Sequence, residues 1–208
     1  MHSGSPGSSE RALGELHAEM RACRQCLEAG FSVIPGAVFS GPASARLMIV
    51  GQAPGVTECE TGRPFNGSSG QRLFDWLAEA GWEESDFRAG QYMTAVTKCY
   101  PGKSPNGKGD RAPTRAEQKL CAPYLEQELT LVEPQVVVPV GSLAVRRFMG
   151  AVRLTDVVGT VVEGGEGRLI VPLPHPSGVN LWLNRPENQE RVAEALTHLE
   201  RLRQELAL

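Results

Sequence analysis

Apolar residues recur along the chain in short blocks that are separated by polar and glycine-rich stretches. The blocks at 46–50, 92–97 and 135–140 are dominated by apolar residues and end near turn-forming residues, which is typical of strands that are buried on both faces. Two further blocks, 157–162 and 169–173, also predict strands. The pattern indicates a central sheet whose two faces are both covered.

The residues between and after these blocks show the spacing of amphipathic helices, with an apolar position at every third or fourth residue. This spacing predicts helices over residues 11–26, 68–81, 114–131, 142–149 and 186–206. Strands that alternate with helices in this way favour a parallel sheet with helices on both faces. We expect an α/β protein with a three-layer α/β/α architecture and a central, mostly parallel β-sheet.

The chain has 208 residues, of which 41% are hydrophobic, and this is an ordinary size for one domain. We expect a single domain over residues 11–208 after a flexible tail over the Ser- and Gly-rich residues 1–10. No stretch reaches the roughly 18 consecutive apolar residues that span a bilayer, and the first residues lack the layout of a secretory signal. These features predict a cytoplasmic protein without membrane contacts, and we expect it to be a monomer.

The overall charge gives no sign of a nucleic-acid binder, because the net charge is −3 and the pI is about 5.9. One local stretch differs, since residues 98–119 carry six basic and two acidic side chains. The basic residues are Lys98, Lys103, Lys108, Arg111, Arg115 and Lys119. Such a stretch either contacts a nucleic-acid backbone or is simply a solvated loop.

Three loops follow predicted strands, and they contain the most unusual residues of the chain. They run from Gly51 to Phe65, from Lys98 to Pro113 and from Pro174 to Asn184. In open α/β sheets, ligands bind at the carboxyl ends of the strands. We therefore expect these three loops to form the functional site.

Four of the five cysteines form a candidate metal site. Cys23 and Cys26 are a C-x-x-C pair at a predicted helix end, and Cys99 and Cys121 stand on either side of the basic loop, whereas Cys59 belongs to another region. A cytoplasmic setting disfavours disulfides and favours metal binding. Four thiolates suit either a tetrahedral zinc or an iron–sulfur cluster, and the spacing does not choose between them. Unrelated buried thiols are the alternative.

Four motifs in order carry a resemblance to a known family. They are Gly51-Gln52-Ala53-Pro54-Gly55-Val56-Thr57-Glu58, Thr61-Gly62-Arg63-Pro64-Phe65 with Gly67 and Gly70, Val96-Thr97-Lys98-Cys99-Tyr100-Pro101, and His175-Pro176-Ser177. Together with the four cysteines, they resemble the family-four, iron–sulfur uracil-DNA glycosylases over nearly everything from Cys23 to Leu206. The resemblance implies a four-iron, four-sulfur cluster on Cys23, Cys26, Cys99 and Cys121, with zinc as the alternative.

The resemblance also implies a function in base-excision repair. The expected partner is DNA that contains a damaged base, and the expected reaction is hydrolysis of the N-glycosidic bond of a flipped base, most simply uracil. The alternatives are a glycosylase for another base such as hypoxanthine, a weakly catalytic DNA-binding homologue, and a cluster or zinc protein that uses the fold for another purpose.

By the same resemblance, His175 would stabilise the leaving uracil oxygen and Glu58 would act near the attacking water. Either residue could instead be structural. Phe65 would stack on the flipped base, and the glycine-rich turn would let backbone N–H groups approach it. The substrate-binding set is Gly51, Gln52, Ala53, Gly55, Phe65, Asn66 and Ala95.

DNA contacts are expected from serines near helix starts, from the basic loop and from the loop after His175. Helix N-termini with serines are suited to phosphates, although each serine could be only a helix cap. The DNA-binding set is Ser68, Ser69, Lys103, Lys108, Arg111, Ser142, Ser177 and Asn180. Residues 178–182 could also wedge into the duplex.

The chain departs from the family pattern at the residues that would read the base. Ala95 stands where the family usually has an Asn whose amide reads the uracil edge, so a donor and an acceptor are missing. Gln52 replaces the usual Glu, and Asn66 replaces a usual apolar residue. We expect Gln52 or Asn66 to contribute to base recognition from a new direction.

Overall fold

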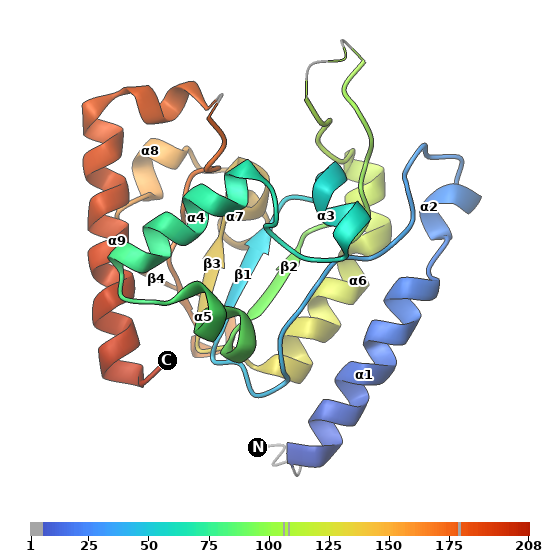
Figure 1. Cartoon of the computed structure of the whole chain (residues 1–208), viewed down its shortest axis with the longest axis horizontal. Helices are drawn as coiled ribbons and strands as arrows, with labels where there is room; N and C mark the ends of the chain where they lie inside the picture. The colour runs from blue at the N-terminus through green and yellow to red at the C-terminus, as the bar shows by residue number, and fades with distance from the viewer. Residues whose placement is uncertain (1–5, 106, 108, 179) are drawn as a thin grey trace.

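The computed structural model describes residues 6–105, 107, 109–178 and 180–208. Its centre is a five-stranded sheet with the strand order β2-β1-β3-β5-β4 (Figure 1). The strands are β1 (Leu47–Gly51), β2 (Tyr92–Ala95), β3 (Val136–Pro139), β4 (Val162–Glu163) and β5 (Leu169–Ile170). All neighbours pair in parallel except β4, which is antiparallel to β5. The expected mostly parallel sheet is confirmed.

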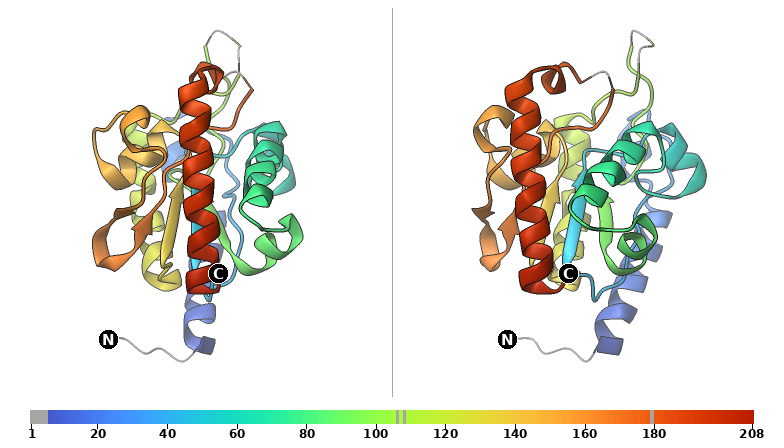
Figure 2. Two further views of the ribbon diagram at one scale, coloured as in Figure 1. Left: turned by 90° about the vertical axis from the view of Figure 1, so that its left-hand side faces the viewer. Right: turned by 60° about the vertical axis from the view of Figure 1, so that its left-hand side comes forward.

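Helices cover both faces of this sheet, which gives three layers (Figures 1 and 2). One face is covered by α1 (Pro6–Ala22) and α6 (Arg115–Val132), and the other by α4 (Ser68–Glu79), α5 (Glu84–Gly90) and α9 (Pro186–Leu206). The shorter elements are α2 (Gln25–Glu28), α3 (Val56–Thr61), α7 (Ser142–Met149), α8 (Leu154–Val157) and the 3-10 turns η1 (Gly165–Gly167) and η2 (Leu181–Asn184). The expected α/β/α architecture is therefore confirmed.

Alternation along β1 divides the core between the two faces. Leu47 and Ile49 pack with α4, α5 and α9, whereas Met48 and Val50 pack with α1 and α6. All four side chains are fully buried, and burial of one such side chain contributes about 1.5–3 kcal/mol. The need to fill both faces explains why β1 is continuously apolar.

Several element boundaries differ from the sequence expectation. Helix α1 begins at Pro6, so the expected tail is wrong for residues 6–10, while residues 1–5 lie outside the described part. The Glu10 carboxylate accepts a hydrogen bond from the Ala43 amide, which ties this first turn to the domain. The expected helix over 11–26 is wrong at its end, because α1 ends at Ala22 and Cys26 lies in the separate helix α2.

The expected strand over 157–162 is also wrong. Helix α8 ends at Val157, and only residues 162–163 form a strand. Gly159 adopts a φ of +92°, which turns the chain before a strand can begin. The buried Val158 therefore joins the core from a helix end.

No helix in the described part of the chain is long and apolar enough to cross a membrane. The loops that follow β1, β2 and β5 all leave the sheet at its carboxyl end. The loop after β2 rises there as a long projection, at the same end as α3 and η2 (Figures 1 and 2). This end of the sheet positions the candidate site.

Candidate active site and cysteine centre

A cavity of about 490 Å³ lies at the carboxyl end of the sheet. All three loops that the sequence singled out contribute to its walls. Its lining includes Gln52, Ala53, Gly55, Glu58, Phe65, Ser68, Ser69, Thr94, Ala95, Asp110, Arg111, His175 and Ser177. The expectation that these loops meet at one site is confirmed.

Glu58 projects from α3 and holds the wall of the cavity together. Its Oε2 accepts a hydrogen bond from the Gly55 amide at 3.1 Å, and its Oε1 accepts from the Asn66 and Gly67 amides, both at 3.2 Å. Three N–H donors fix the carboxylate and connect both ends of the loop through it. Glu58 is therefore a pre-organised negative charge at the cavity.

Phe65 adopts a backbone conformation that non-glycine residues rarely use, with a φ of 50°. The Arg88 guanidinium holds it there by donating to the carbonyl oxygens of Pro64 at 2.8 Å and Phe65 at 3.0 Å. A Cβ on Gly70 would stand 1.9 Å from the Phe65 carbonyl oxygen, so only glycine fits. The aromatic wall of the cavity thus depends on a strained loop that its surroundings hold in place.

His175 follows β5 and is half-buried at the cavity. Its Nδ1 accepts a hydrogen bond from the Ser177 amide at 3.2 Å, and its carbonyl oxygen accepts one from the Asn180 side chain at 2.7 Å. Because an amide N–H can only donate, the neutral ring carries its proton on Nε2. Burial lowers the pKa of the imidazole, although the nearby Glu58 opposes this. The ring is therefore a neutral donor at neutral pH.

A buried polar network lies beneath the Ala95 end of the cavity. Lys98 Nζ donates to the Ala95 carbonyl oxygen at 2.6 Å and forms an ion pair with Glu128 at 2.5 Å. Glu128 also accepts from the Tyr92 hydroxyl at 3.0 Å. The assignment of Lys98 to the surface basic stretch is wrong, because its side chain is only 2% exposed. Its charge is paired with Glu128 in the interior of the protein.

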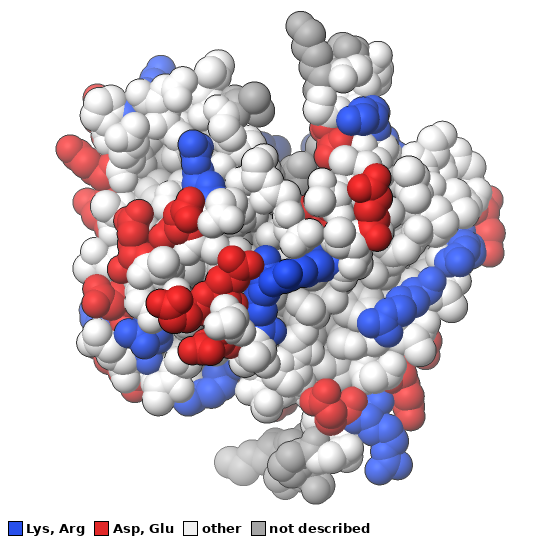
Figure 3. Space-filling model, viewed as in Figure 1, with Lys and Arg blue, Asp and Glu red and all other residues white. Residues whose placement is uncertain are grey.

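The residues expected to bind DNA are spread over the cavity and its surroundings. Four of them line the cavity: Ser68, Ser69, Arg111 and Ser177. Three described residues lie elsewhere: Asn180 lines a separate hollow beside η2, Ser142 begins α7, and Lys103 is outside the cavity lining. The remaining residue, Lys108, lies outside the described residues. Arg111 is also paired with Glu117 at 2.5 Å. On the face drawn in Figure 3, basic and acidic side chains are interspersed, without one continuous basic surface.

Two members of the expected substrate-binding set lie outside the cavity lining. Gly51 is covered by Phe65, whose ring would contact a Cβ there at 3.1 Å. The Asn66 side chain donates to the Thr61 hydroxyl at 3.4 Å. Asn66 therefore contributes its backbone amide to Glu58, and Gln52 is the amide side chain that reaches the cavity wall.

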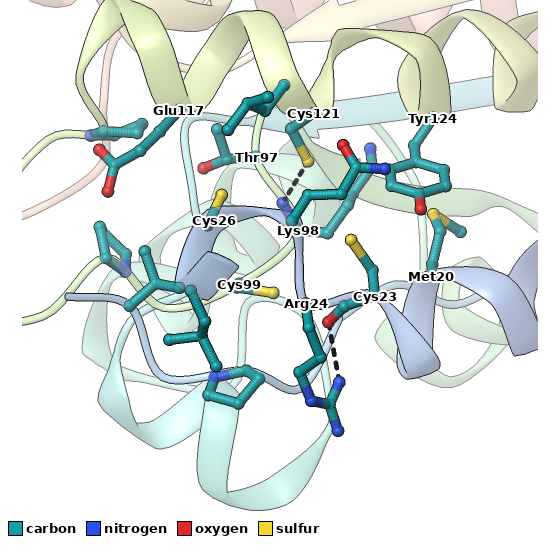
Figure 4. Close-up of a pocket in the computed structure, with 17 residues that line it drawn as sticks. Met20, Cys23, Arg24, Cys26, Thr97, Lys98, Cys99, Glu117, Cys121 and Tyr124 are labelled. Carbon is teal, nitrogen blue, oxygen red and sulfur yellow. Dashed lines mark hydrogen bonds between the residues drawn. The ribbon is translucent and has the colours of Figure 1, made fainter. Parts of the chain in front are cut away.

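The four expected cysteines line a second pocket, which Lys98 also lines (Figure 4). Cys23 comes from the end of α1, Cys26 from α2, Cys99 from the loop after β2 and Cys121 from α6. Their sulfur atoms point into a common space in Figure 4. The Lys98 amide donates to Cys121 Sγ at 3.3 Å. Cys59, on α3, is not part of this pocket.

Burial in the pocket disfavours the thiolate form of three of these cysteines, Cys26, Cys99 and Cys121, and raises their pKa values. Burial and the neighbouring thiols raise the pKa of Cys26 to about 11, and burial likewise raises that of Cys99 to about 11. In the described part of the chain, no three His, Cys, Asp or Glu side chains form a group that could hold a single metal ion. The four cysteines nevertheless line one pocket.

Asp110, with its buried partner Tyr100, is a feature of the cavity wall that the sequence did not predict. Asp110 lines the cavity, and its Oδ1 accepts a hydrogen bond from the Tyr100 hydroxyl at 2.6 Å. In the sequence, Asp110 was only one of two acidic residues among six basic ones. Its position in a loop after a strand was the available signal.

In this fold, one cavity is surrounded by a histidine, a carboxylate, an aromatic wall and a glycine-rich turn. This arrangement suits an enzyme that excises a base. The chain belongs to the uracil DNA glycosylase superfamily, whose family model matches residues 38–200.

Curated relatives agree with this assignment. The type-4 uracil-DNA glycosylase of Pyrobaculum aerophilum is 33% identical over 177 residues, which cover 80% of this chain and 84% of the relative. The type-4 enzyme of Thermotoga maritima is 34% identical over 157 residues, covering 74% and 76%. That of Archaeoglobus fulgidus is 31% identical over 189 residues, covering 86% and 87%.

Proposed function

We propose that the protein is a uracil-DNA glycosylase that hydrolyses the N-glycosidic bond of a uracil nucleotide flipped out of DNA. The observation that carries the proposal is the state of His175. Its Nδ1 is occupied by the Ser177 amide, and burial lowers the pKa of the ring, so a neutral Nε2–H donor lines the cavity.

This donor matches the charge that develops in the reaction. Hydrolysis breaks the bond between C1′ of deoxyribose and N1 of uracil, and the electron pair leaves with the base. Negative charge then spreads onto the carbonyl oxygens of the base, where a fixed N–H donor lowers the barrier. A neutral imidazole donates without the cost of holding a second charge in a half-buried site.

Phe65 and Glu58 complete the site on either side of the bond that breaks. The ring of Phe65 offers a flat wall on which the extruded base can stack. Glu58 supplies a fixed carboxylate that favours the positive charge on the sugar, and the three amides that hold it prevent reorganisation during the reaction.

Base recognition rests on groups other than the side chain of residue 95. Ala95 has no polar side-chain atom, and its carbonyl oxygen already accepts from Lys98. Gln52 and the turn Ala53–Gly55 line the cavity beside it, and we propose that they read the polar edge of uracil. The missing amide also favours a second candidate, a glycosylase that accepts hypoxanthine.

DNA contacts would come from the cavity rim and from the loop after β2. We assign phosphate contacts to Ser68, Ser69 and Ser177, which line the cavity, and backbone contacts to Lys103, Lys108, Arg111, Ser142 and Asn180. The N-terminus of α4, which begins at Ser68, adds a favourable dipole for a phosphate.

For the four cysteines we favour a four-iron, four-sulfur cluster over a zinc ion. Four thiolates suit either group, and the choice rests on the similarity of the chain to the type-4 uracil-DNA glycosylases, a family that carries such a cluster. Cys23, Cys26, Cys99 and Cys121 would be the ligands, with the Lys98 amide donating to one sulfur. When bound, the cluster would join α1, α2, α6 and the loop after β2 through four thiolate bonds.

The function is tested by base release from duplexes that differ at one position, which holds uracil, hypoxanthine or thymine. We expect release of uracil and none of thymine. Faster release of hypoxanthine would favour the second candidate. If the folded, metal-loaded protein binds the uracil duplex with salt-dependent affinity but releases no base, it is a DNA-binding homologue and the proposal is wrong.

A further inference from the structure

We infer that Asp110 is a second carboxylate of the active site and that it accepts the proton of the attacking water. The inference rests on the proposed function and deepens it, because it assigns the proton-transfer step to a residue outside the family motifs.

Asp110 stands close to Glu58 at the Gly55 turn. A Cβ on Gly55 would lie 2.7 Å from Glu58 Oε2 and 3.2 Å from Asp110 Oδ2. The two carboxylates are therefore within about 6 Å of each other, and both stand next to a residue that has no side chain. Gly55 has a φ of −85°, so it is the space, and not the backbone angle, that requires glycine here.

The two carboxylates differ in what already binds them. Both oxygens of Glu58 accept backbone amides, three in all. These amides occupy three of the roughly four lone-pair sites that a carboxylate offers. Glu58 is thus suited to face the sugar cation as a fixed carboxylate, and it has little accepting capacity left for the attacking water.

Asp110 has the opposite surroundings. Its side chain is exposed at the cavity wall, so a water molecule can reach it. Among the described residues, the hydroxyl of the buried Tyr100 is a neutral donor that orients its Oδ1. An oriented carboxylate that remains open to water is the group that general base catalysis requires.

The loop that carries Asp110 is itself held in place. The Arg111 amide donates to the Gly102 carbonyl oxygen at 3.0 Å, and Lys103 and Asp110 form a β-bridge across the loop. The Arg111 guanidinium is anchored to Glu117 in the first turn of α6. Tyr100 directly follows Cys99, so the cysteine pocket and the carboxylate are parts of one structural unit.

The step balances as a hydrolysis. The water oxygen forms a bond to C1′ while the C1′–N1 electron pair leaves with uracil, and one water proton moves to Asp110. The uracil anion then takes up a proton from solvent, and Asp110 releases its proton to solvent. One water is consumed, and no oxidant or other co-reactant is needed.

The test compares Asp110→Asn with Glu60→Gln in the metal-loaded protein. Glu60 is an exposed acid on the same helix as Glu58 and does not line the cavity, so its variant controls for lost negative charge. We expect Asp110→Asn to lower the single-turnover rate of uracil release about 100-fold or more. Affinity for a duplex with an uncleavable 2′-fluorinated deoxyuridine should stay within about threefold, and Glu60→Gln should behave like the wild type.

Tyr100→Phe keeps the ring and removes the hydroxyl that orients Asp110. Its single-turnover rate should therefore lie between those of Asp110→Asn and Glu60→Gln. Asp110→Asn that keeps the wild-type rate would overturn the inference and leave the proposed function standing. Equal losses of rate and affinity would also overturn it, because Asp110 would then act in DNA binding or folding. A wild-type protein that releases no uracil would overturn the proposed function itself.

Discussion

Lys98 Nζ lies 2.5 Å from Glu128 Oε2, and both side chains are buried, with exposed fractions of 2% and 0%. The pair joins the loop that carries Cys99 to the carboxyl-terminal part of α6, seven residues after Cys121. It also fixes the Ala95 carbonyl oxygen beneath the base cavity. One buried ion pair therefore connects the two centres of the molecule.

Removing one partner of this pair should be costly. Lys98→Met leaves the Glu128 carboxylate buried without its cation, and we expect the free energy of unfolding to fall by about 3–5 kcal/mol. Lys119→Met, at an exposed position on the same helix as Glu128, should change it by less than about 0.5 kcal/mol. Urea unfolding of both variants measures the difference. Equal stability of the two would show that the pair does not hold this region.

Gly70 and Gly14 form a matched pair of helical glycines. Alanine at position 14 meets nothing within 4 Å, so Gly14→Ala should stabilise the protein by about 0.5–1 kcal/mol. Alanine at position 70 would collide with the Phe65 carbonyl oxygen and displace the strained loop. We expect Gly70→Ala to lose both stability and uracil release. A fully active Gly70→Ala protein would contradict the role given to the Phe65 wall.

The pH dependence of base release reports the protonation of His175. Burial lowers the pKa of the ring below its usual value of 6.5, so the neutral donor persists into mildly acidic solution. The single-turnover rate should therefore remain level from pH 8 down to 6.5 and fall only at lower pH. A rate that already halves near pH 7 would mean that the ring is not the neutral donor described.

Substitutions of single cysteines test the ligand assignment, because Cys59 lies outside the pocket of the other four and serves as a control. Cys26→Ser should remove or weaken the visible absorbance of an iron–sulfur cluster and lower the melting temperature, whereas Cys59→Ser should retain both. Metal analysis distinguishes iron from zinc in the wild type. Zinc in stoichiometric amount, or a Cys59→Ser protein without metal, would contradict the assignment.

Much of the fold follows from local pattern. Helices α4, α7 and α9 begin and end within two residues of the expected positions, because their apolar spacing and flanking glycines or proline are strong local signals. Helices α3 and α5 are too short to show a period, so they escaped prediction. The region near 157–162 is apolar because α8 and Val158 pack into the core, and this cannot be distinguished from a strand by composition.

The sequence predicted the site residues that lie in recognisable motifs. It did not predict those that only the folding of the chain brings to the site. His175, Glu58 and Phe65 were expected at the cavity and line it. The burial of Lys98 depends on Glu128, which is 30 residues away in sequence, and no local signal marks the pair. Asp110 reaches the Gly55 turn only through tertiary packing, so its charge looked like part of a solvated loop.

The central claim is that His175 stabilises the departing base, and single-turnover release of uracil by His175→Ala tests it most directly. With the cluster loaded and affinity for the uncleavable uracil duplex retained, we expect the rate to fall about 100- to 1,000-fold, as for the loss of one donor to a developing anion. A His175→Ala protein that releases uracil at the wild-type rate would contradict the account.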